Sequence, residues 1–220
     1  MNKELKKIIK SDLKRYGYSS EKTVPFTIKN TLYGYKYMKI LRLCKYYKEK
    51  KSLLFYLYKI KLNQYSIKYG FQISYATQIG KGFYIGHRGT VIINYKAIIG
   101  DNVNVAHNVT IGEEVRGNRK GTPIIGNRVW IGANSTIVGN IKIGDDVIIA
   151  PNTFVNFDVP SHSLVISNRA EIKYKEKSLT KFLVKSLRKF PISSQTVFHS
   201  RFAYSFSFFQ SYQVMILQDY

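Results

Sequence analysis

The sequence predicts a mainly β protein, a parallel β-helix preceded by an α-helical region. Two observations lead to this fold class. An aliphatic residue recurs every six positions between Ile73 and Val155, and residues 1–72 carry apolar side chains at helical spacing among lysines. The 220 residues provide for one ordinary domain with an appendage, or for two small domains.

The first predicted element is a basic helical region, residues 1–72. Leu5, Ile9 and Leu13 follow one another at intervals of four residues, with Ile8 beside them, as on one face of a helix. A second apolar set has similar spacing among lysines and consists of Met38, Leu41, Leu43, Leu53, Leu54 and Leu57. We therefore expect helices with lysine-rich polar faces.

The second element, residues 73–160, is the internal repeat. Its hexads begin at Ile73, Ile79, Ile85, Ile93, Ile99, Val105, Ile111, Ile125, Ile131, Ile137, Ile143, Ile149 and Val155. A six-residue period suits a short strand followed by a corner, and three such units make one triangular coil of about 18 residues. The fifth position of the hexads is small or aliphatic, which fits a narrow, dry interior.

Two breaks interrupt the period. Two extra residues lie between Ile85 and Ile93, in the segment 86–90, and eight extra residues lie between Ile111 and Ile125. The second insertion is polar and rich in glycine, so we expect a projecting loop at 112–124. Breaks in a solenoid usually mark its functional face.

Counting faces predicts a column of side chains. Positions 85, 105, 131 and 149 fall on the same face of successive coils, because three hexads complete one turn. The residues two positions later should therefore stack at the inter-strand spacing of about 4.8 Å. This column consists of His87, His107, Ala133 and Pro151. Two of the four histidines are thus expected to be neighbours.

The charge is concentrated outside the repeat. The formal net charge is +22, and residues 1–72 contribute +14 of it, against +3 from residues 73–156 and +5 from residues 157–220. Three interpretations of the basic region stay open: contact with a membrane surface, nucleic-acid binding without a recognition motif, and a composition generally rich in Lys, Ile, Asn and Tyr. The third element, residues 161–220, is predicted as a basic helix and an aromatic-rich tail.

The cysteine content and the length of the apolar runs limit the expected cellular location of the protein. The single cysteine, Cys44, excludes a disulfide framework and a Cys-rich zinc site, and we expect it to be a packed thiol. The sequence has no run of 18 apolar residues. We therefore expect a cytoplasmic protein, with the inner face of the membrane as a candidate docking place for residues 1–72.

At this point the sequence resembles a known family, the hexapeptide-repeat acyltransferases with a left-handed parallel β-helix, in particular their serine acetyltransferase-like branch. The similarity runs from residue 73 to about residue 160. It rests on four motifs: Ile85-Gly86-His87-Arg88-Gly89-Thr90, Val109-Thr110-Ile111-Gly112, Val129-Trp130-Ile131-Gly132-Ala133-Asn134 and Asp158-Val159-Pro160.

The resemblance implies roles for the column and the loop. In such enzymes the histidine equivalent to His87 is the general base, and His107 is a candidate to orient it or to contact the acceptor. Acetyl-CoA is the cosubstrate, with no tightly bound cofactor and no metal. The remaining expected site residues are the pantetheine contacts Ala133 and Pro151, the phosphate contacts Arg119 and Lys120, and the acceptor loop residues Gly112, Gly121 and Thr122. Basic residues after the solenoid, such as Arg169 and Lys173, are the alternative phosphate contacts. The resemblance further implies a homotrimer with each site between two β-helices.

Two departures from serine acetyltransferases affect the predicted acceptor. The carboxylate that orients the base in those enzymes is replaced here by Gln72, and their serine-binding Arg-His pair is replaced by Gly121 and Thr122. Similar short, basic sequences belong to capsule and O-antigen gene clusters. The sequence therefore favours O-acetylation of a sugar hydroxyl in surface polysaccharide biosynthesis. The alternatives are serine O-acetylation for cysteine biosynthesis and an inactive structural β-helix.

Overall fold

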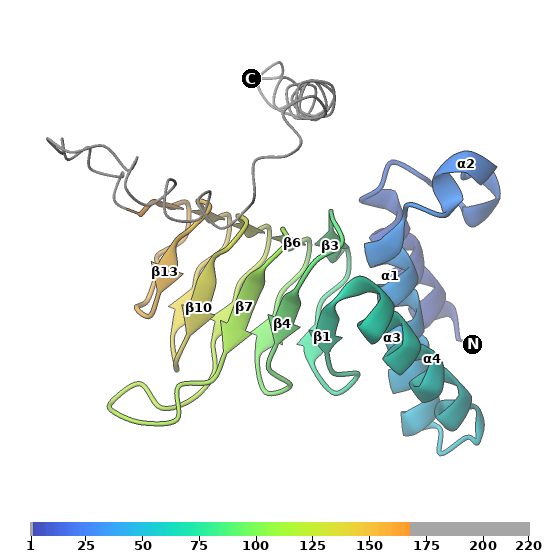
Figure 1. Cartoon of the computed structure of the whole chain (residues 1–220), viewed down its shortest axis with the longest axis horizontal. Helices are drawn as coiled ribbons and strands as arrows, with labels where there is room; N and C mark the ends of the chain where they lie inside the picture. Colours follow the sequence, from blue (N-terminus) through green and yellow to red (C-terminus); the bar gives the residue numbers. More distant parts are fainter. Residues whose placement is uncertain (1, 168–220) are drawn as a thin grey trace, which may run out of the picture. The chain divides into compact units, whose positions relative to one another are not determined.

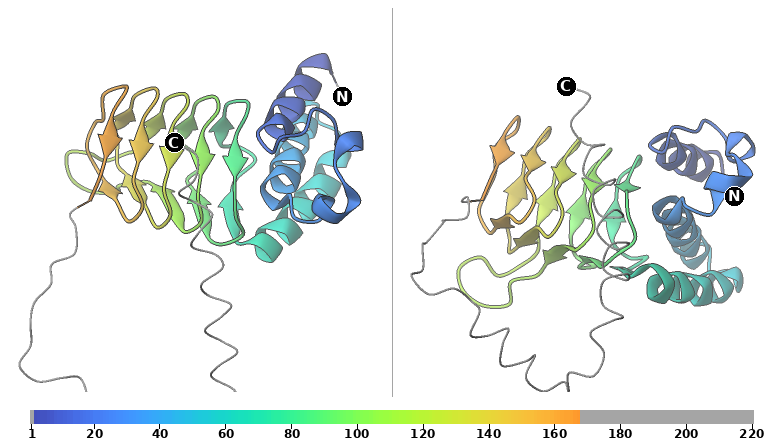
Figure 2. Two further views of the ribbon diagram at one scale, coloured as in Figure 1. Left: turned by 90° about the horizontal axis from the view of Figure 1, so that it is seen from above. Right: turned by 45° about the horizontal axis from the view of Figure 1, so that its top comes forward.

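The structure is a computed structural model that describes residues 2–167, all within one compact unit (Figure 1). The expected C-terminal basic helix and aromatic tail lie outside the described residues. The described part begins with helices and continues as a solenoid of parallel strands. Both views of Figure 2 show the helices at one end of the solenoid, next to its first coil.

The basic N-terminal region is helical, as expected. It contains α1 (Lys3–Lys14), a 3₁₀ turn (Glu21–Thr23), α2 (Phe26–Lys29), α3 (Tyr33–Glu49) and α4 (Leu54–Tyr69). Asn2 caps α1 by accepting a hydrogen bond of 2.9 Å from the N–H of Leu5. Gly70 caps the C-terminus of α4. Its φ of 80° is a left-handed conformation that favours glycine and turns the chain directly into the first strand.

The apolar positions of these helices do not all face the core. Leu5, Ile9 and Leu13 of α1 are buried, as are Met38 and Leu41 of α3. Cys44 is buried as well, and this burial raises the pKa of its thiol, so it is the packed thiol that the sequence predicts. By contrast the side chains of Leu53, Leu54 and Leu57 are exposed.

The repeat forms five coils. The first consists of β1 (Phe71–Ile73), β2 (Gln78–Ile79) and β3 (Tyr84–Ile85), and the second of β4 (Val91–Ile93), β5 (Ile98–Ile99) and β6 (Asn104–Val105). The third consists of β7 (Val109–Gly112), β8 (Ile124–Ile125) and β9 (Trp130–Ile131), and the fourth of β10 (Thr136–Val138), β11 (Lys142–Ile143) and β12 (Ile148–Ile149). The last consists of β13 (Phe154–Val155), a bridge from Val159 to Ile143, and β14 (Leu164–Val165).

Strands of successive coils pair in parallel and make three sheets. The first sheet has the order β1-β4-β7-β10-β13, the second β2-β5-β8-β11 and the third β3-β6-β9-β12-β14. The first hexad positions lie at or next to the ends of the strands and, apart from the half-buried Ile79, point into the buried interior. The predicted left-handed parallel β-helix with an N-terminal helical region is therefore confirmed.

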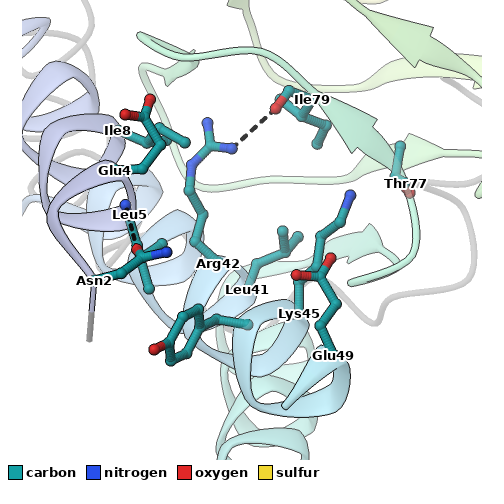
Figure 3. Close-up of a pocket in the computed structure, with 11 residues that line it drawn as sticks. Asn2, Glu4, Leu5, Ile8, Leu41, Arg42, Lys45, Glu49, Thr77 and Ile79 are labelled. Atoms are coloured by element: carbon teal, nitrogen blue, oxygen red, sulfur yellow. Dashed lines mark hydrogen bonds between the residues drawn. The ribbon is translucent and has the colours of Figure 1, made fainter.

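Three side chains of the helical region close the open end of the solenoid, one on each edge strand. The Tyr37 hydroxyl donates to the C=O of Ile73 on β1 at 2.8 Å, and the Tyr16 hydroxyl donates to the C=O of Ile85 on β3 at 2.9 Å. Arg42 donates to the C=O of Ile79 on β2 at 2.9 Å (Figure 3). These bonds satisfy edge groups that would otherwise be free to pair with another chain.

The Arg42 contact continues into a buried ion pair. Its guanidinium contacts the Asp12 carboxylate through two hydrogen bonds, of 2.7 and 3.1 Å. Asp12 also accepts from the N–H groups of Gly82 and Phe83, at 2.9 and 3.1 Å. Burial raises the pKa of the Asp12 carboxyl, and the contacts with Arg42 oppose that rise. The pair therefore joins α1, α3 and the first coil.

No helix in residues 2–167 is both long enough and apolar enough to span a lipid bilayer.

Candidate active site

The first break in the repeat is a bulge, residues 86–90, between β3 and β4. Its glycine, Gly89, has a φ of 136°, and the Gly89 N–H donates to the C=O of Tyr69 at the end of α4, at 3.2 Å. Ile85, directly before the bulge, is held on both backbone groups by the Tyr16 hydroxyl. The bulge is thus anchored at both ends by the helical region, and His87 is exposed on it.

The structure brings His87 and His107 together. Their ring centroids are 5.9 Å apart, and the rings meet edge to face at 87°. The cause is the register of the third sheet, because Ile85 pairs with Val105 and each histidine follows two residues later. His87 is exposed and His107 is half-buried, so both imidazoles stand at the surface of one corner.

The predicted column continues through Ala133 and Pro151, since Val105 pairs with Ile131 and Ile131 pairs with Ile149. The coils are closely packed here: a Cβ on Gly132 would lie 2.5 Å from the backbone nitrogen of Pro151. Ala133 is half-buried and Pro151 is exposed, so both residues of the column lie at the surface of this corner.

An asparagine ladder stabilises the same corner. Asn108, Asn134 and Asn152 each follow a column residue and adopt left-handed backbone conformations, with φ of 57°, 61° and 59°. The amide of Asn108 donates to Asn134 at 3.1 Å, and that of Asn134 donates to Asn152 at 3.0 Å. Asparagine tolerates this conformation better than most residues, and the ladder fixes the stacking of the coils below the histidines.

The second break is the predicted loop, between β7 and β8. Glu114 and Gly121 pair as an antiparallel bridge with two hydrogen bonds of 2.9 Å, which makes the loop a narrow hairpin that Figure 2 shows projecting from the solenoid. Arg119 donates to the C=O of Asn156, and its own C=O accepts from the N–H of Asn140 at 2.8 Å. The hairpin is therefore tied back to the later coils.

The loop and the histidine column occupy different corners. The loop joins the first sheet to the second, whereas the bulge with His87 joins the third sheet to the first. Within one chain, the expected loop residues are consequently not brought to His87. They are Gly112, Arg119, Lys120, Gly121 and Thr122.

Gln72, at the position of the family carboxylate, lies on β1 beside Ile92 of β4 and is exposed. Within residues 2–167 the histidine with a carboxylate partner is His162, whose Nδ1 is 2.9 Å from Asp146, away from the column. His199 lies outside the described residues.

A groove that the sequence did not predict opens beside His87. It has a volume of about 560 Å³ and is bounded by the bulge, by β3 and by the segment between α1 and α3. Its lining contains four tyrosines and is uncharged apart from one arginine and His87. It consists of Arg15, Tyr16, Gly17, Tyr18, Ile28, Thr31, Leu32, Tyr33, Tyr84, Gly86 and His87. The Arg88 guanidinium lies 4.6 Å from the centre of the Tyr33 ring at the same place. The cluster of tyrosines in a lysine-rich segment was the one signal for it in the sequence.

A second hollow is structural in character. It has a volume of about 260 Å³ and lies between α1, α3 and β2, around Arg42, with Glu4, Lys45 and Glu49 at its rim (Figure 3). Arg42 is already bonded to Asp12 and to two backbone carbonyls. Its donors are therefore used by the fold.

Comparisons with known proteins agree with this architecture. The profile of the bacterial transferase hexapeptide family (six repeats) matches residues 122–156. Serine acetyltransferase 4 of Arabidopsis thaliana is 36% identical over 104 residues, which are 47% of this chain and 29% of that protein. The chain thus spans less than a third of that relative.

Solved structures extend the similarity into the helical region. The soybean serine acetyltransferase apoenzyme is 28% identical, with a TM-score of 0.63 over 77% of this chain and 69% of that chain. The Neisseria gonorrhoeae serine acetyltransferase, solved in complex with serine, is 26% identical, with a TM-score of 0.61 over 78% of this chain and 70% of that chain. The solenoid is therefore similar to the hexapeptide-repeat transferases, and in particular to serine acetyltransferases.

Proposed function

We propose that this protein is an acetyl-CoA-dependent O-acetyltransferase with His87 as its general base. The observation that carries the proposal is the pair His87 and His107, 5.9 Å apart on the bulged corner of a serine acetyltransferase-like solenoid. His87 is exposed, so its imidazole can reach an acceptor hydroxyl, accept its proton and later return it.

The proposed reaction needs one base and a set of donors. His87 takes the proton of an acceptor hydroxyl, and the acceptor oxygen attacks the thioester carbonyl of acetyl-CoA. The C–S bond of the tetrahedral intermediate then breaks, the acetyl group stays on the acceptor oxygen, and His87 returns the proton to the CoA thiolate. Backbone N–H groups near the acetyl carbonyl stabilise the oxyanion. His107, edge-on to His87, orients the base or contacts the acceptor.

Acetyl-CoA lies along the column in this proposal, with its pantetheine chain against Ala133 and Pro151. Arg119 and Lys120 suit the CoA phosphates by charge. They stand at a different corner from His87 in one chain, so a second copy of the chain supplies them. A homotrimer with a site between each pair of solenoids fulfils this requirement.

Serine is the first candidate acceptor, because the relatives similar to this chain are serine acetyltransferases. The uncharged Gly121 and Thr122 offer no partner for a carboxylate. A positively charged partner for the serine carboxylate can come instead from Arg15, which lines the groove beside His87, or from Arg88, which lies over the neighbouring Tyr33 ring. An arginine binds a carboxylate through two parallel hydrogen bonds.

A sugar hydroxyl of a surface polysaccharide precursor is the second candidate. The groove of about 560 Å³ lined by Tyr16, Tyr18, Tyr33 and Tyr84 favours it, because aromatic rings present large apolar surfaces with polar tips, a suitable lining for sugars. Serine fills a small part of such a volume. The two candidates share the same base and the same donor.

Release of the CoA thiol, measured with serine, nucleotide sugars and oligosaccharides as acceptors, tests the proposal. The acceptor with the highest kcat/KM identifies the substrate class. His162→Ala is the matched control for His87→Ala, because His162 is exposed on the solenoid away from the column. If none of the acceptors in the panel leads to release of the CoA thiol, the result would support an inactive structural β-helix instead.

A further inference from the structure

The outer face of α4 carries an exposed apolar stripe. The inner face of this helix buries Phe55 and Leu62, seven residues apart, and Tyr69 a further seven residues on. On the opposite side, Leu53 before the first turn, Leu57, Ile60 and Ile67 remain 82%, 63%, 58% and 88% exposed. Spacings of four, three and seven residues put these four side chains on one side of the helix.

Lysines border the stripe. Residues 50–69 contain five lysines and no acidic residue, and all five are exposed: Lys50, Lys51, Lys59, Lys61 and Lys68. A helix with an apolar side between basic flanks is suited to the boundary between lipid headgroups and acyl chains, where the apolar side chains enter the bilayer and the lysines meet anionic headgroups. Because the flanks of the stripe are positively charged, the surface that it contacts should be negatively charged.

We propose that α4 docks this protein on an anionic membrane surface through Leu53, Leu57, Ile60 and Ile67. The lysine flanks select an anionic lipid surface over a second copy of the chain, because two copies that meet along this stripe bring their lysines together. Apolar burial supplies the part of the affinity that salt does not remove, and the lysines supply the salt-dependent part.

Docking through α4 brings the candidate active site close to the membrane. The helix ends at Tyr69, whose C=O accepts the hydrogen bond from Gly89 in the bulge that carries His87. If the proposed acetyl transfer is correct, an acceptor linked to a lipid would reach His87 from this surface. The docking itself does not depend on that activity, so a vesicle assay tests the two proposals separately.

The experiment is co-sedimentation of the full chain with phosphatidylcholine vesicles that contain about one third phosphatidylglycerol, and with pure phosphatidylcholine vesicles. Leu57→Gln combined with Ile60→Gln should lower the partition coefficient for the anionic vesicles about tenfold or more. Val115→Gln combined with Ile166→Gln is the matched control, because those side chains are 66% and 69% exposed elsewhere. Thermal unfolding should show that both double variants remain folded.

A charge variant tests the flanks. Lys59→Gln, Lys61→Gln and Lys68→Gln together should weaken binding to the anionic vesicles and flatten its decrease with added salt. Equal sedimentation of the wild type and the Leu57→Gln/Ile60→Gln variant would overturn the proposal, and so would equal binding to the two kinds of vesicle. If the wild type were a dimer, the Leu57→Gln/Ile60→Gln variant a monomer, and neither protein bound vesicles, the stripe would instead be an interface with a second copy of the chain.

Discussion

The Tyr16 hydroxyl binds both backbone groups of Ile85: it donates to the C=O at 2.9 Å and accepts from the N–H at 3.2 Å. Burial of Tyr16 raises the pKa of this hydroxyl, so it stays neutral and keeps its proton for the donated bond. Ile85 directly precedes the bulge with His87. The helical region therefore closes the solenoid and also fixes the corner that carries the candidate base.

Tyr16→Phe should loosen this corner. The substitution keeps the ring and removes both hydrogen bonds with Ile85, so the free energy of unfolding should fall by about 1–3 kcal/mol. We expect kcat for thiol release to fall several-fold, with KM for acetyl-CoA unchanged. Tyr65→Phe on α4 is the matched control for loss of a hydroxyl away from the bulge. Equal kcat for Tyr16→Phe and the wild type would contradict a positioning role.

The buried ion pair of Asp12 and Arg42 should be the most costly polar contact to break where the helices meet the solenoid. Arg42→Met leaves the Asp12 carboxylate buried without its cation, which should lower the free energy of unfolding by about 3–5 kcal/mol. Lys39→Met is the control, because it breaks the exposed pair with Glu21, worth about 1 kcal/mol or less. Urea unfolding of the two variants measures the difference, and similar midpoints would refute it.

A carboxylate at position 72 should assist the base. Gln72→Asp restores, by resemblance to serine acetyltransferases, the group that orients the histidine and stabilises its protonated form. We expect kcat/KM to rise several-fold. Gln78→Asp is the matched control, since Gln78 is also an exposed glutamine on a strand of the first coil. A decrease in kcat/KM for Gln72→Asp alone would mean that another group already orients His87.

Acid should weaken the solenoid through Asp145. Its carboxylate accepts a hydrogen bond of 2.7 Å from the N–H of Asn127 on the coil before, which lowers the pKa of Asp145 below its ordinary value of 3.8. A lowered pKa in the folded state adds stability above pH 3.8 that is lost as the pH falls through the folded-state value. The difference in melting temperature between the wild type and Asp145→Asn should therefore shrink below pH 4. A difference in melting temperature that stays constant with pH would show that ionisation of Asp145 does not stabilise the fold.

The sequence predicted the strands and the histidine column because a strict hexad repeat determines both. Each hexad begins with an interior aliphatic residue, so counting three hexads per coil was enough to bring His87 beside His107. The sequence did not predict the contacts that Tyr16 and Arg42 make with the first coil, because these contacts join residues more than 35 positions apart and follow from how the helices pack on that coil.

The loop and α4 show the same limit. Both breaks were expected to mark the functional face of the solenoid, but each turn of the solenoid passes three corners, and the loop leaves from another corner than His87. In α4, an apolar residue every three or four positions indicated a helix. The pattern did not show that Leu57 faces outward while Leu62 packs inward, because both sides of the helix are apolar.

The central claim is that His87 is the general base, and the most direct measurement is CoA thiol release by His87→Ala with the best acceptor. The proposed mechanism predicts that kcat falls about 10²- to 10⁴-fold, with the melting temperature unchanged and with His162→Ala as active as the wild type. Full activity of His87→Ala would contradict the mechanism.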